Sequence, residues 1–339
     1  MQVSDSQSPQ NPSIEQLMVT LESLRSEIKP VLDEAYCQRL GRPPYDALAM
    51  LKALFYRTRT QSLRQLCQEL RSNPRLLGLT GLSKVPSHQT FSNFVTRIGE
   101  ERLRRISGLV VGELRKYWPD FGEIMSVDGT VVKAYARNNR GIRSTTDPDA
   151  RFGYKEHNPS GKPIFEFGYR LTIATDDRYE VPITGVTTPA NANEGRLYPG
   201  ILRQVKNLGL PLGVVVADAQ YDSRKNLWLT IAYGAKPVIQ LNPRASKMAK
   251  LTGTRRSDAI LPIRRNSPEW KRYAAMRSAS ERVNSALKDH VGLKTLKTRR
   301  LQRVAAFFWA CMLTKQLFAL SAARLGRNDL SRSVLPWCY

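Results

Sequence analysis

A change of pattern near Trp118-Pro119-Asp120 constrains the fold of this 339-residue chain more than any other feature. Before it, from Ser13 to about Tyr117, apolar residues recur at helical spacing, as in Leu48–Phe55. After it, short runs of alternating or continuous apolar residues indicate strands. The pattern therefore predicts a helical amino-terminal domain over residues 13–118 and a domain built on a sheet over residues 119–325.

The amino-terminal domain carries features of a helix-turn-helix unit. Asn73-Pro74 marks the exit of one helix, and Ser87–Phe94 has the pattern of a short capped helix. Together with many arginines, these features suggest a DNA-binding unit, and an ordinary helical bundle is an equally good interpretation. Residues 1–12 are predicted to be a disordered lead, and residues 326–339 a carboxyl-terminal tail.

The second domain has three strands followed by strands that alternate with helices. This order predicts an α/β fold, a ribonuclease-H-like mixed sheet with flanking helices, preceded by the all-α domain. A polar loop at 137–162 and a basic irregular insertion at about 243–267 interrupt the order. The predicted strands are 124–135, 165–173, 181–187, 214–217 and 237–241, and the predicted helices are 193–209, 223–233, one opening at 267 and one at about 301–325.

The charge of the chain indicates its partner. The chain has 53 Lys and Arg against 29 Asp and Glu, a net charge of +24. Residues 244–303 alone hold 17 basic and 4 acidic residues, and because such clusters attract polyanions, nucleic acid is the expected partner. The chain contains no Walker A sequence, so a nucleotide cofactor is not expected. The most apolar stretch, Val304–Leu313, is too short to span a bilayer, so we expect a cytoplasmic protein without membrane contact.

Three carboxylates stand where metal-dependent chemistry would need them. Asp128 and Asp218 lie within or at the end of apolar runs, and Glu281 lies on a basic helix. A carboxylate in a strand is costly unless a positive charge neutralises it. Two Mg²⁺ ions, for which Mn²⁺ can substitute, would activate the attacking oxygen and stabilise the leaving oxygen of a phosphodiester. Asp222 is the alternative to Asp218, but its position is more typical of a helix N-cap.

The helix that carries Glu281 presents basic side chains beside it. At about 100° per residue, Glu281 shares one face with residues three, four, seven and eight positions away. Such a face fits either a salt-bridged surface or an acid flanked by phosphate-binding cations. The residues on that face are Tyr273, Arg277, Glu281, Asn284 and Lys288, and those predicted to contact DNA are Arg264, Arg265, Trp270, Tyr273, Arg277, Arg282 and Lys288.

These motifs resemble the DDE transposases of bacterial insertion sequences, in the group with a Tyr-Arg-Glu-Lys signature. The resemblance rests on Asp128-Gly-Thr, on Asp218-Ala-Gln-Tyr-Asp-Ser and on the helix carrying Glu281, and it spans about residues 15–325. One departure is that three residues separate Tyr273 from Arg277, where the family usually has two. The resemblance implies a ribonuclease-H-like catalytic domain, Mg²⁺ at the three carboxylates, recognition of terminal inverted repeats and a homodimer that brings two ends together.

The sequence thus predicts the transposase of an insertion sequence. It would bind the terminal inverted repeats, cleave double-stranded DNA at the element ends and transfer the 3′-OH to target DNA, in association with the bacterial nucleoid. A DNA-binding protein in which the carboxylates are remnants, and a metal-dependent nuclease without strand transfer, are the alternatives. The acidic triplet, with Arg277 and Lys288 in register, favours catalysis over binding alone.

Overall fold

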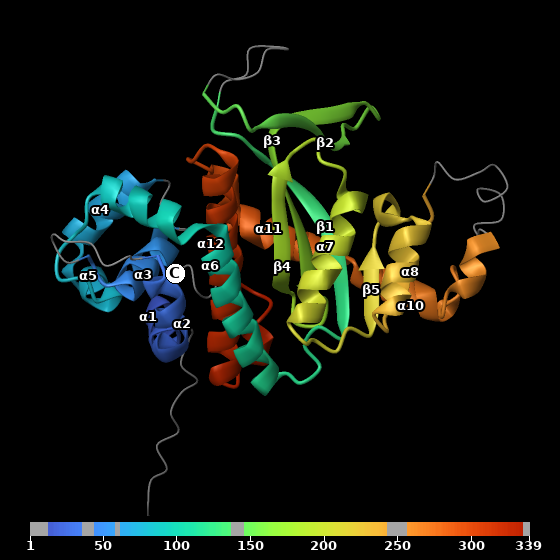
Figure 1. The fold of residues 1–339 in the computed structure, drawn as a ribbon, viewed down its shortest axis with the longest axis horizontal. Helices are drawn as coiled ribbons and strands as arrows, with labels where there is room; N and C mark the ends of the chain where they lie inside the picture. Colours follow the sequence, from blue (N-terminus) through green and yellow to red (C-terminus); the bar gives the residue numbers. More distant parts are fainter. Residues whose placement is uncertain (1–12, 36–43, 58–61, 137–145, 243–255, 335–339) are drawn as a thin grey trace, which may run out of the picture.

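The computed structural model describes residues 13–35, 44–57, 62–136, 146–242 and 256–334. The predicted lead at 1–12, most of the basic insertion and the last five residues of the tail lie outside the described residues. Figure 1 shows amino-terminal helices at one side, a mixed sheet with its own helices at the other, and two long helices, α6 (His88–Tyr117) and α12 (Leu301–Arg324), between them.

Within the described residues, the amino-terminal region consists of helices joined by short capped turns. Asn73 ends one helix and caps the next through its side chain, with Pro74 at the first helical position, as the sequence predicts. Ser87 caps α6, but this helix is not short: it runs for 30 residues, with a kink at Gly99, whose φ of 64° is left-handed. The helices before α6 are α1 (Ile14–Glu22), α2 (Arg25–Asp33), α3 (Ala47–Arg57), α4 (Leu63–Ser72) and α5 (Pro74–Thr80).

In the part of the chain that the structure describes, the sheet has six strands and mixed direction. The order is β2-β3-β1-β5-β6, with β4 paired to β3; β1 is antiparallel to β3 and parallel to β5, which is parallel to β6. Antiparallel strands followed by parallel strands that alternate with helices form the ribonuclease-H-like arrangement, so the predicted fold class is confirmed. The strands are β1 (Ile124–Lys133), β2 (Arg151–His157), β3 (Pro163–Asp176), β4 (Val181–Pro189), β5 (Val214–Ala217) and β6 (Lys236–Ile239).

Strand β2 corrects the sequence prediction, which assigned residues 137–162 to a loop. It pairs with the first half of β3, from Pro163 to Gly168, and extends the sheet beyond the other strands (Figure 1). Its residues are mostly polar because much of this hairpin is exposed, with Phe152 about half exposed. The hairpin is therefore stabilised by its ladder rather than by a buried face.

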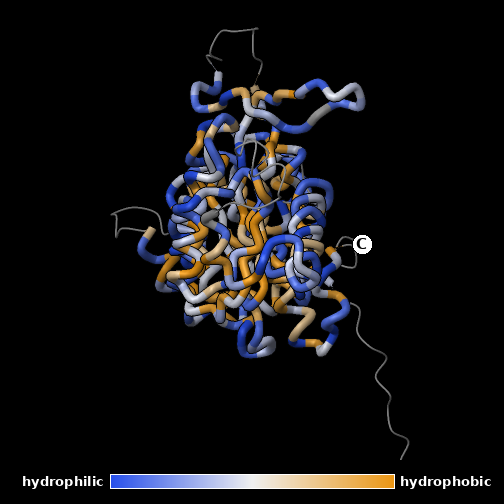
Figure 2. Tube along the Cα trace, turned by 90° about the vertical axis from the view of Figure 1, so that its right-hand side faces the viewer, coloured by the Kyte–Doolittle hydropathy of each residue, from blue (hydrophilic) through white to orange (hydrophobic). Residues whose placement is uncertain are grey.

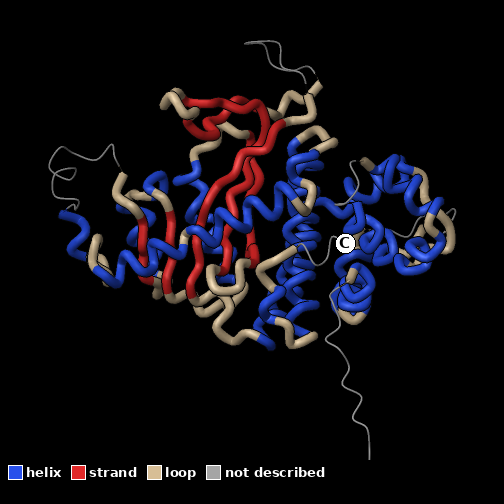
Figure 3. The backbone as a smooth tube through the Cα atoms, turned by 180° about the vertical axis from the view of Figure 1, so that it is seen from behind, coloured by secondary structure: helices blue, strands red, loops and turns tan. Residues whose placement is uncertain are grey.

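Helices cover both faces of the sheet. Helices α7 (Glu194–Asn207) and α8 (Arg224–Ala232) lie on one face, and α10 (Pro268–Met276) and α11 (Ser278–Asp289) cross the other, as Figure 3 shows from behind. The sequence predicts one continuous helix here, and this is wrong, because the helix breaks at Arg277, which ends α10 and begins α11. Short 3-10 helices are η1 (Ala219–Tyr221), η2 (Arg256–Ile260), η3 (Leu293–Thr295) and η4 (Asn328–Leu330).

Helix α12 is the apolar centre of the molecule. It packs against α6, against β4 and against the amino-terminal helices, so one hydrophobic cluster extends from Leu17 to Val334. Figure 2 shows hydrophobic residues gathered in the interior and hydrophilic ones outside. By length and composition alone α12 could cross a membrane, but 94% of its most apolar window is buried inside the protein, which accounts for that composition.

Candidate active site

Asp128 and Asp218 are brought side by side by the pairing of β1 with β5. These strands are parallel, and their last paired residues are Val127 and Ala217, one position before the two aspartates. Neighbouring strands lie roughly 4.8 Å apart, so two side chains in register are close enough to share a ligand. The apolar runs Ile124–Val127 and Val214–Ala217 therefore set the position of both carboxylates.

Both carboxylates point to the sheet face that α10 and α11 cover. Residues two apart on a strand share a face, and Ile124 and Val214 pack there against Trp270 of α10. On the same face, the amide Nδ2 of Asn284 on α11 donates a hydrogen bond of 2.9 Å to Asp128 Oδ2. The amide oxygen of Asn284 is buried without a hydrogen-bond partner among the described residues. Asn284 thus links α11 to the site.

Arg277 supplies positive charge between the carboxylates. Its guanidinium donates a 2.6 Å hydrogen bond to Glu281 Oε1, and it lies near enough to Asp128 and Asp218 to influence both. Burial raises the pKa of the Asp128 carboxyl and of the Asp218 carboxyl, and the charge of Arg277 opposes that rise. Lys288 lies near Asp128 as well, and burial lowers the pKa of its amine.

The donor set fits a divalent cation at the aspartate pair. Asp128 accepts a hydrogen bond from the Asn284 amide, and Asp218 accepts one from the backbone N–H of Gln220, at 2.8 Å, while neither carboxylate forms an ion pair among the described residues. Hard carboxylate oxygens of this kind are the ligands that Mg²⁺ prefers. The side chain of Glu281 is 56% exposed and held by Arg277, and within the described residues no three His, Cys, Asp or Glu side chains form a ready metal cluster. The metal-binding role of Glu281 stays a prediction.

A buried ion pair supports the site from the other face of the sheet. Arg170 of β3 pairs with Glu194 at the start of α7, and Tyr221 OH donates a 2.8 Å hydrogen bond to Glu194 Oε2. Gly129, next to Asp128, leaves room for this carboxylate, since a Cβ there would lie 2.2 Å from Glu194 Oε2. Because Tyr221 lies three residues after Asp218, the pair anchors the turn that carries Asp218.

Sequence reasoning missed this support and did not include Asn284 among the site residues. Glu194 has the pattern of an ordinary acid in the first turn of a helix, where the dipole favours it. Arg170 occupies a polar position of an alternating strand, which predicts contact with solvent, yet it is buried. Only the helical spacing of Asn284 from Glu281 indicated a place beside the carboxylates.

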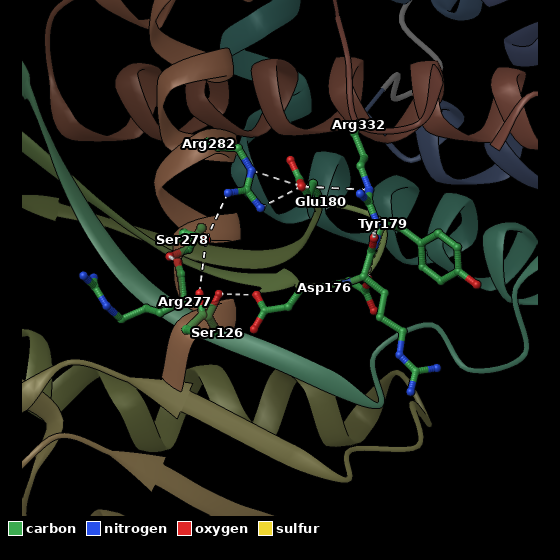
Figure 4. A network of polar contacts seen from close by, with 12 residues as sticks. Ser126, Asp176, Tyr179, Glu180, Arg277, Ser278, Arg282 and Arg332 are labelled. Atoms are coloured by element: carbon green, nitrogen blue, oxygen red, sulfur yellow. Dashed lines mark hydrogen bonds and ion pairs between the residues drawn. The ribbon is translucent and has the colours of Figure 1, made fainter. Parts of the chain in front are cut away.

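Arg282, predicted to contact DNA, is engaged in a structural network. Its guanidinium donates to Glu180 Oε1 at 2.9 and 3.0 Å and to the Ser278 hydroxyl at 3.0 Å. Arg332 reaches the same Glu180 oxygen at 3.9 Å from the carboxyl-terminal segment. In Figure 4 these residues face one another, whereas Arg277 points away from them. Arg282 therefore fixes α11 against the β3–β4 turn, and a DNA contact for it stays a prediction.

A further predicted DNA contact, that of Arg265, is corrected by burial. Arg265 is only 4% exposed and forms ion pairs with Asp222 at 2.9 Å and Asp258 at 3.0 Å, which leaves it no surface for a phosphate. Asp222 is thus not the helix cap that the sequence suggested, because Ser223 caps α8. Trp270 is half-buried and packs on the sheet, and a DNA contact for it stays a prediction.

The remaining predicted contacts divide by position. Tyr273 lies on α10, packs against the same small cluster as Trp270 and carries Arg272 over its ring at 4.9 Å. It lies on α10, whereas Lys288 lies on α11, and a DNA contact for Tyr273 stays a prediction. Arg264 is exposed at the surface and is available to a partner.

Comparison with known families agrees with this geometry. A family model described as Transposase DDE domain matches residues 119–314, and one described as Transposase domain (DUF772) matches residues 2–97. The chain belongs to the DDE transposase family. Members of this family are nucleotidyl-transfer enzymes that generally use divalent metal ions.

Solved structures with similarity to the chain are also transposases. The piggyBac transposase synaptic complex with hairpin DNA shares 13% identity over 94% of this chain and 78% of that chain, with a TM-score of 0.45. The Mos1 transposase paired-end complex with left transposon end shares 14% identity over 85% of this chain and 100% of that chain, with a TM-score of 0.21. No curated protein matches the chain significantly.

Proposed function

We propose that this transposase binds the ends of an insertion sequence, cleaves the DNA there and transfers the freed 3′-OH to target DNA. The observation that carries the proposal is the pairing of Asp128 with Asp218 at the end of two parallel strands, under a helix that contributes Asn284, Arg277 and Lys288. Phosphodiester cleavage and strand transfer both need such a cation-binding edge facing a polyanion.

Asp128 and Asp218 would hold the divalent cations, Mg²⁺ with Mn²⁺ as a substitute, and Glu281 would complete the set once Arg277 releases it. Bound cations supply an activated oxygen nucleophile and a stabilised leaving oxygen. Asn284 keeps the Asp128 carboxylate oriented through its amide. The sheet and the Glu194 ion pair hold the two aspartates at a fixed separation, which positions both for the same phosphodiester.

The cations on α11 would bind the DNA strand. Arg277 carries a planar guanidinium that suits phosphate oxygens, and Lys288 offers a point charge further along the same face of the helix. When a DNA phosphate binds, Arg277 can release Glu281 and pair with the phosphate instead. The Glu281 carboxylate is then free. The partners are the terminal inverted repeats and target DNA, and a homodimer would bring the two ends into one complex.

A strand-transfer assay tests the proposal. The protein is incubated with Mg²⁺, supercoiled plasmid and a labelled duplex copied from the DNA that flanks its gene. Joined products are expected from the wild type, and none from Asp128→Asn, Asp218→Asn or Glu281→Gln, although these variants should still shift the duplex in a gel. Cleavage without joining would make the protein a nuclease, and a shifted but uncut duplex a DNA-binding protein. A variant that nicks at the wild-type rate would show that its residue is wrongly assigned.

A further inference from the structure

A groove of about 640 Å³ lies between the amino-terminal helices and the segment that leads into α12, and neither Asp128 nor Asp218 lines it. We call it the basic groove. Among the described residues that line it, none is acidic. Its charged and aromatic lining includes Arg64, His88, Tyr135, Lys297, Arg299 and Arg303.

The cations of the basic groove are held by an aromatic ring. Lys297 Nζ lies 5.0 Å from the centroid of the Tyr135 ring, and the Arg299 guanidinium lies 4.9 Å from it. Arg299 Nε also donates a 2.7 Å hydrogen bond to the Tyr135 carbonyl. Lys297 and Arg299 are themselves exposed, and Tyr135 is 45% exposed, so both cations remain open to solvent. A ring orders a cation without cancelling its charge, unlike a carboxylate.

Two arginines elsewhere in the amino-terminal region are neutralised by carboxylates. Arg105 donates to Glu34 through two bonds of 2.5 and 2.8 Å, and Arg104 pairs with Glu101. In the described part of the chain, by contrast, Arg64 and Arg303 form no ion pair with a carboxylate. The positive charge of the groove is therefore available to a ligand.

Nearby acids fix the backbone of the groove. Asp149 Oδ2 accepts the Leu301 N–H at 2.9 Å, and Asp147 Oδ1 accepts the Arg300 N–H at 3.2 Å. Asp147 also accepts the hydroxyl of Tyr169, at 2.6 Å. These acids hold the start of α12 in place, so the cations on either side of Arg300 are positioned before any ligand arrives, which lowers the cost of ordering them on binding.

Two helix amino termini add to the positive potential. The first turn of α4, with Ser62 as its cap, lines the groove, and so does the start of α6. Partial positive charge at these ends favours anions. Gln89 and Ser92 on α6 also face the groove, and they offer amide and hydroxyl groups that can meet a base edge. A lipid headgroup or free phosphate would leave these groups unused.

We propose that the basic groove binds the phosphate backbone of duplex DNA, at a place separate from the aspartate pair. The identity of the DNA as an element end rests on the proposed function, whereas binding itself does not. One surface of the protein then holds the duplex while the edge of the sheet carries out the chemistry.

A binding assay with the full-length protein tests the groove. The probe is a labelled duplex of random sequence, titrated by fluorescence anisotropy at several salt concentrations without divalent metal. Changing Arg64, Arg299 and Arg303 together to Gln should reduce the slope of log affinity against log salt by about 2–3, since each lost phosphate contact removes roughly 0.9. The matched control is the triple change of Arg203, Lys206 and Arg224 to Gln, which removes equal charge from exposed positions on α7 and α8. The control should leave the slope near wild type.

The outcomes separate this proposal from the proposed function. Equal slopes for the groove variant and wild type, with melting curves that show both are folded, would overturn the groove as a DNA site. A groove-dependent complex that single-stranded RNA displaces more readily than unlabelled duplex would overturn duplex DNA as its ligand. The strand-transfer result for Asp128→Asn depends on neither outcome, so either proposal can fail alone.

Discussion

Two clusters of acidic and basic side chains differ in how completely their charges are paired. The closed cluster consists of Arg265, Asp222 and Asp258, with side chains 2%, 0% and 8% exposed and N–O distances of 2.9 and 3.0 Å. The open cluster consists of Asp128 and Asp218 with Arg277, where neither aspartate has a direct ion pair within the described residues.

The difference distinguishes a cluster that stabilises the fold from one that can bind a ligand. In the closed cluster Arg265 donates to two carboxylates and to the Ile239 carbonyl, so the charges are already compensated without a ligand. In the open cluster burial raises the carboxyl pKa values, and the compensating charge must come from outside. A carboxylate that is buried but has no direct cationic partner is therefore a better guide to function than a count of charges.

The largest effect is expected when the closed cluster is broken. Arg265→Ala leaves two buried carboxylates without their cation, which should lower the free energy of unfolding by about 3–5 kcal/mol. Urea denaturation measures this loss. Arg264→Ala is the matched control, because Arg264 is adjacent to Arg265 but exposed, and its loss should change stability by less than about 0.5 kcal/mol. If Arg265→Ala is as stable as the control, the ion pairs of Arg265 do not stabilise the fold.

The open cluster should respond in activity and not in stability. Asn284→Ala removes the amide that orients Asp128, and nicking should fall by about 10–100-fold, the usual effect of losing a partner of a metal ligand. Ser285→Ala, at the exposed neighbouring position, should nick at the wild-type rate. Equal rates for the two variants would remove Asn284 from the site.

A third group of acids, Asp176, Asp177 and Glu180, is buried like the closed cluster but contains a carboxyl with a raised pKa like the open cluster. Burial raises the pKa of Asp177 to about 8, although Ser126 donates a 2.5 Å hydrogen bond to it. Asp176 and Glu180 add negative charge nearby, and Arg282 faces them from α11. The folded protein therefore keeps a proton on Asp177 that the unfolded chain loses from about pH 4 upward.

This proton predicts a pH dependence of stability. Between about pH 4 and about pH 8 the folded state binds more protons at Asp177, so stability falls as pH rises, by at most about 1.4 kcal/mol per pH unit. Asp177→Asn cannot titrate, and its advantage over wild type should grow from about pH 5 to about pH 8. Urea denaturation at both pH values measures it, and parallel curves for the two proteins would contradict the raised pKa.

The aspartate pair could be predicted because its position depends on local pattern. The apolar runs before Asp128 and Asp218, Ile124–Val127 and Val214–Ala217, pair residue by residue, and continuous apolar runs of this type form parallel strands inside a sheet. The break at Arg277 could not be predicted, because neither Gly nor Pro interrupts the helical pattern there. It depends on how α10 and α11 pack on different strands.

Which charged residues are buried could not be predicted from the sequence either. Arg264 and Arg265 are adjacent and chemically identical, yet one is exposed and the other is enclosed by two carboxylates. Those carboxylates come from positions 7 and 43 residues away, so no local pattern could reveal the pairing. The basic groove was hidden for the same reason, because Tyr135 and Arg299 meet only in the fold.

The placement of α12 has a practical consequence for anyone who dissects the protein. The helix comes from the far end of the chain, yet it covers the apolar side of α6. A fragment that stops at Tyr117 would leave that side in water and is expected to aggregate rather than to report on DNA affinity. Point substitutions in the intact polypeptide are the way to assign roles to its two halves.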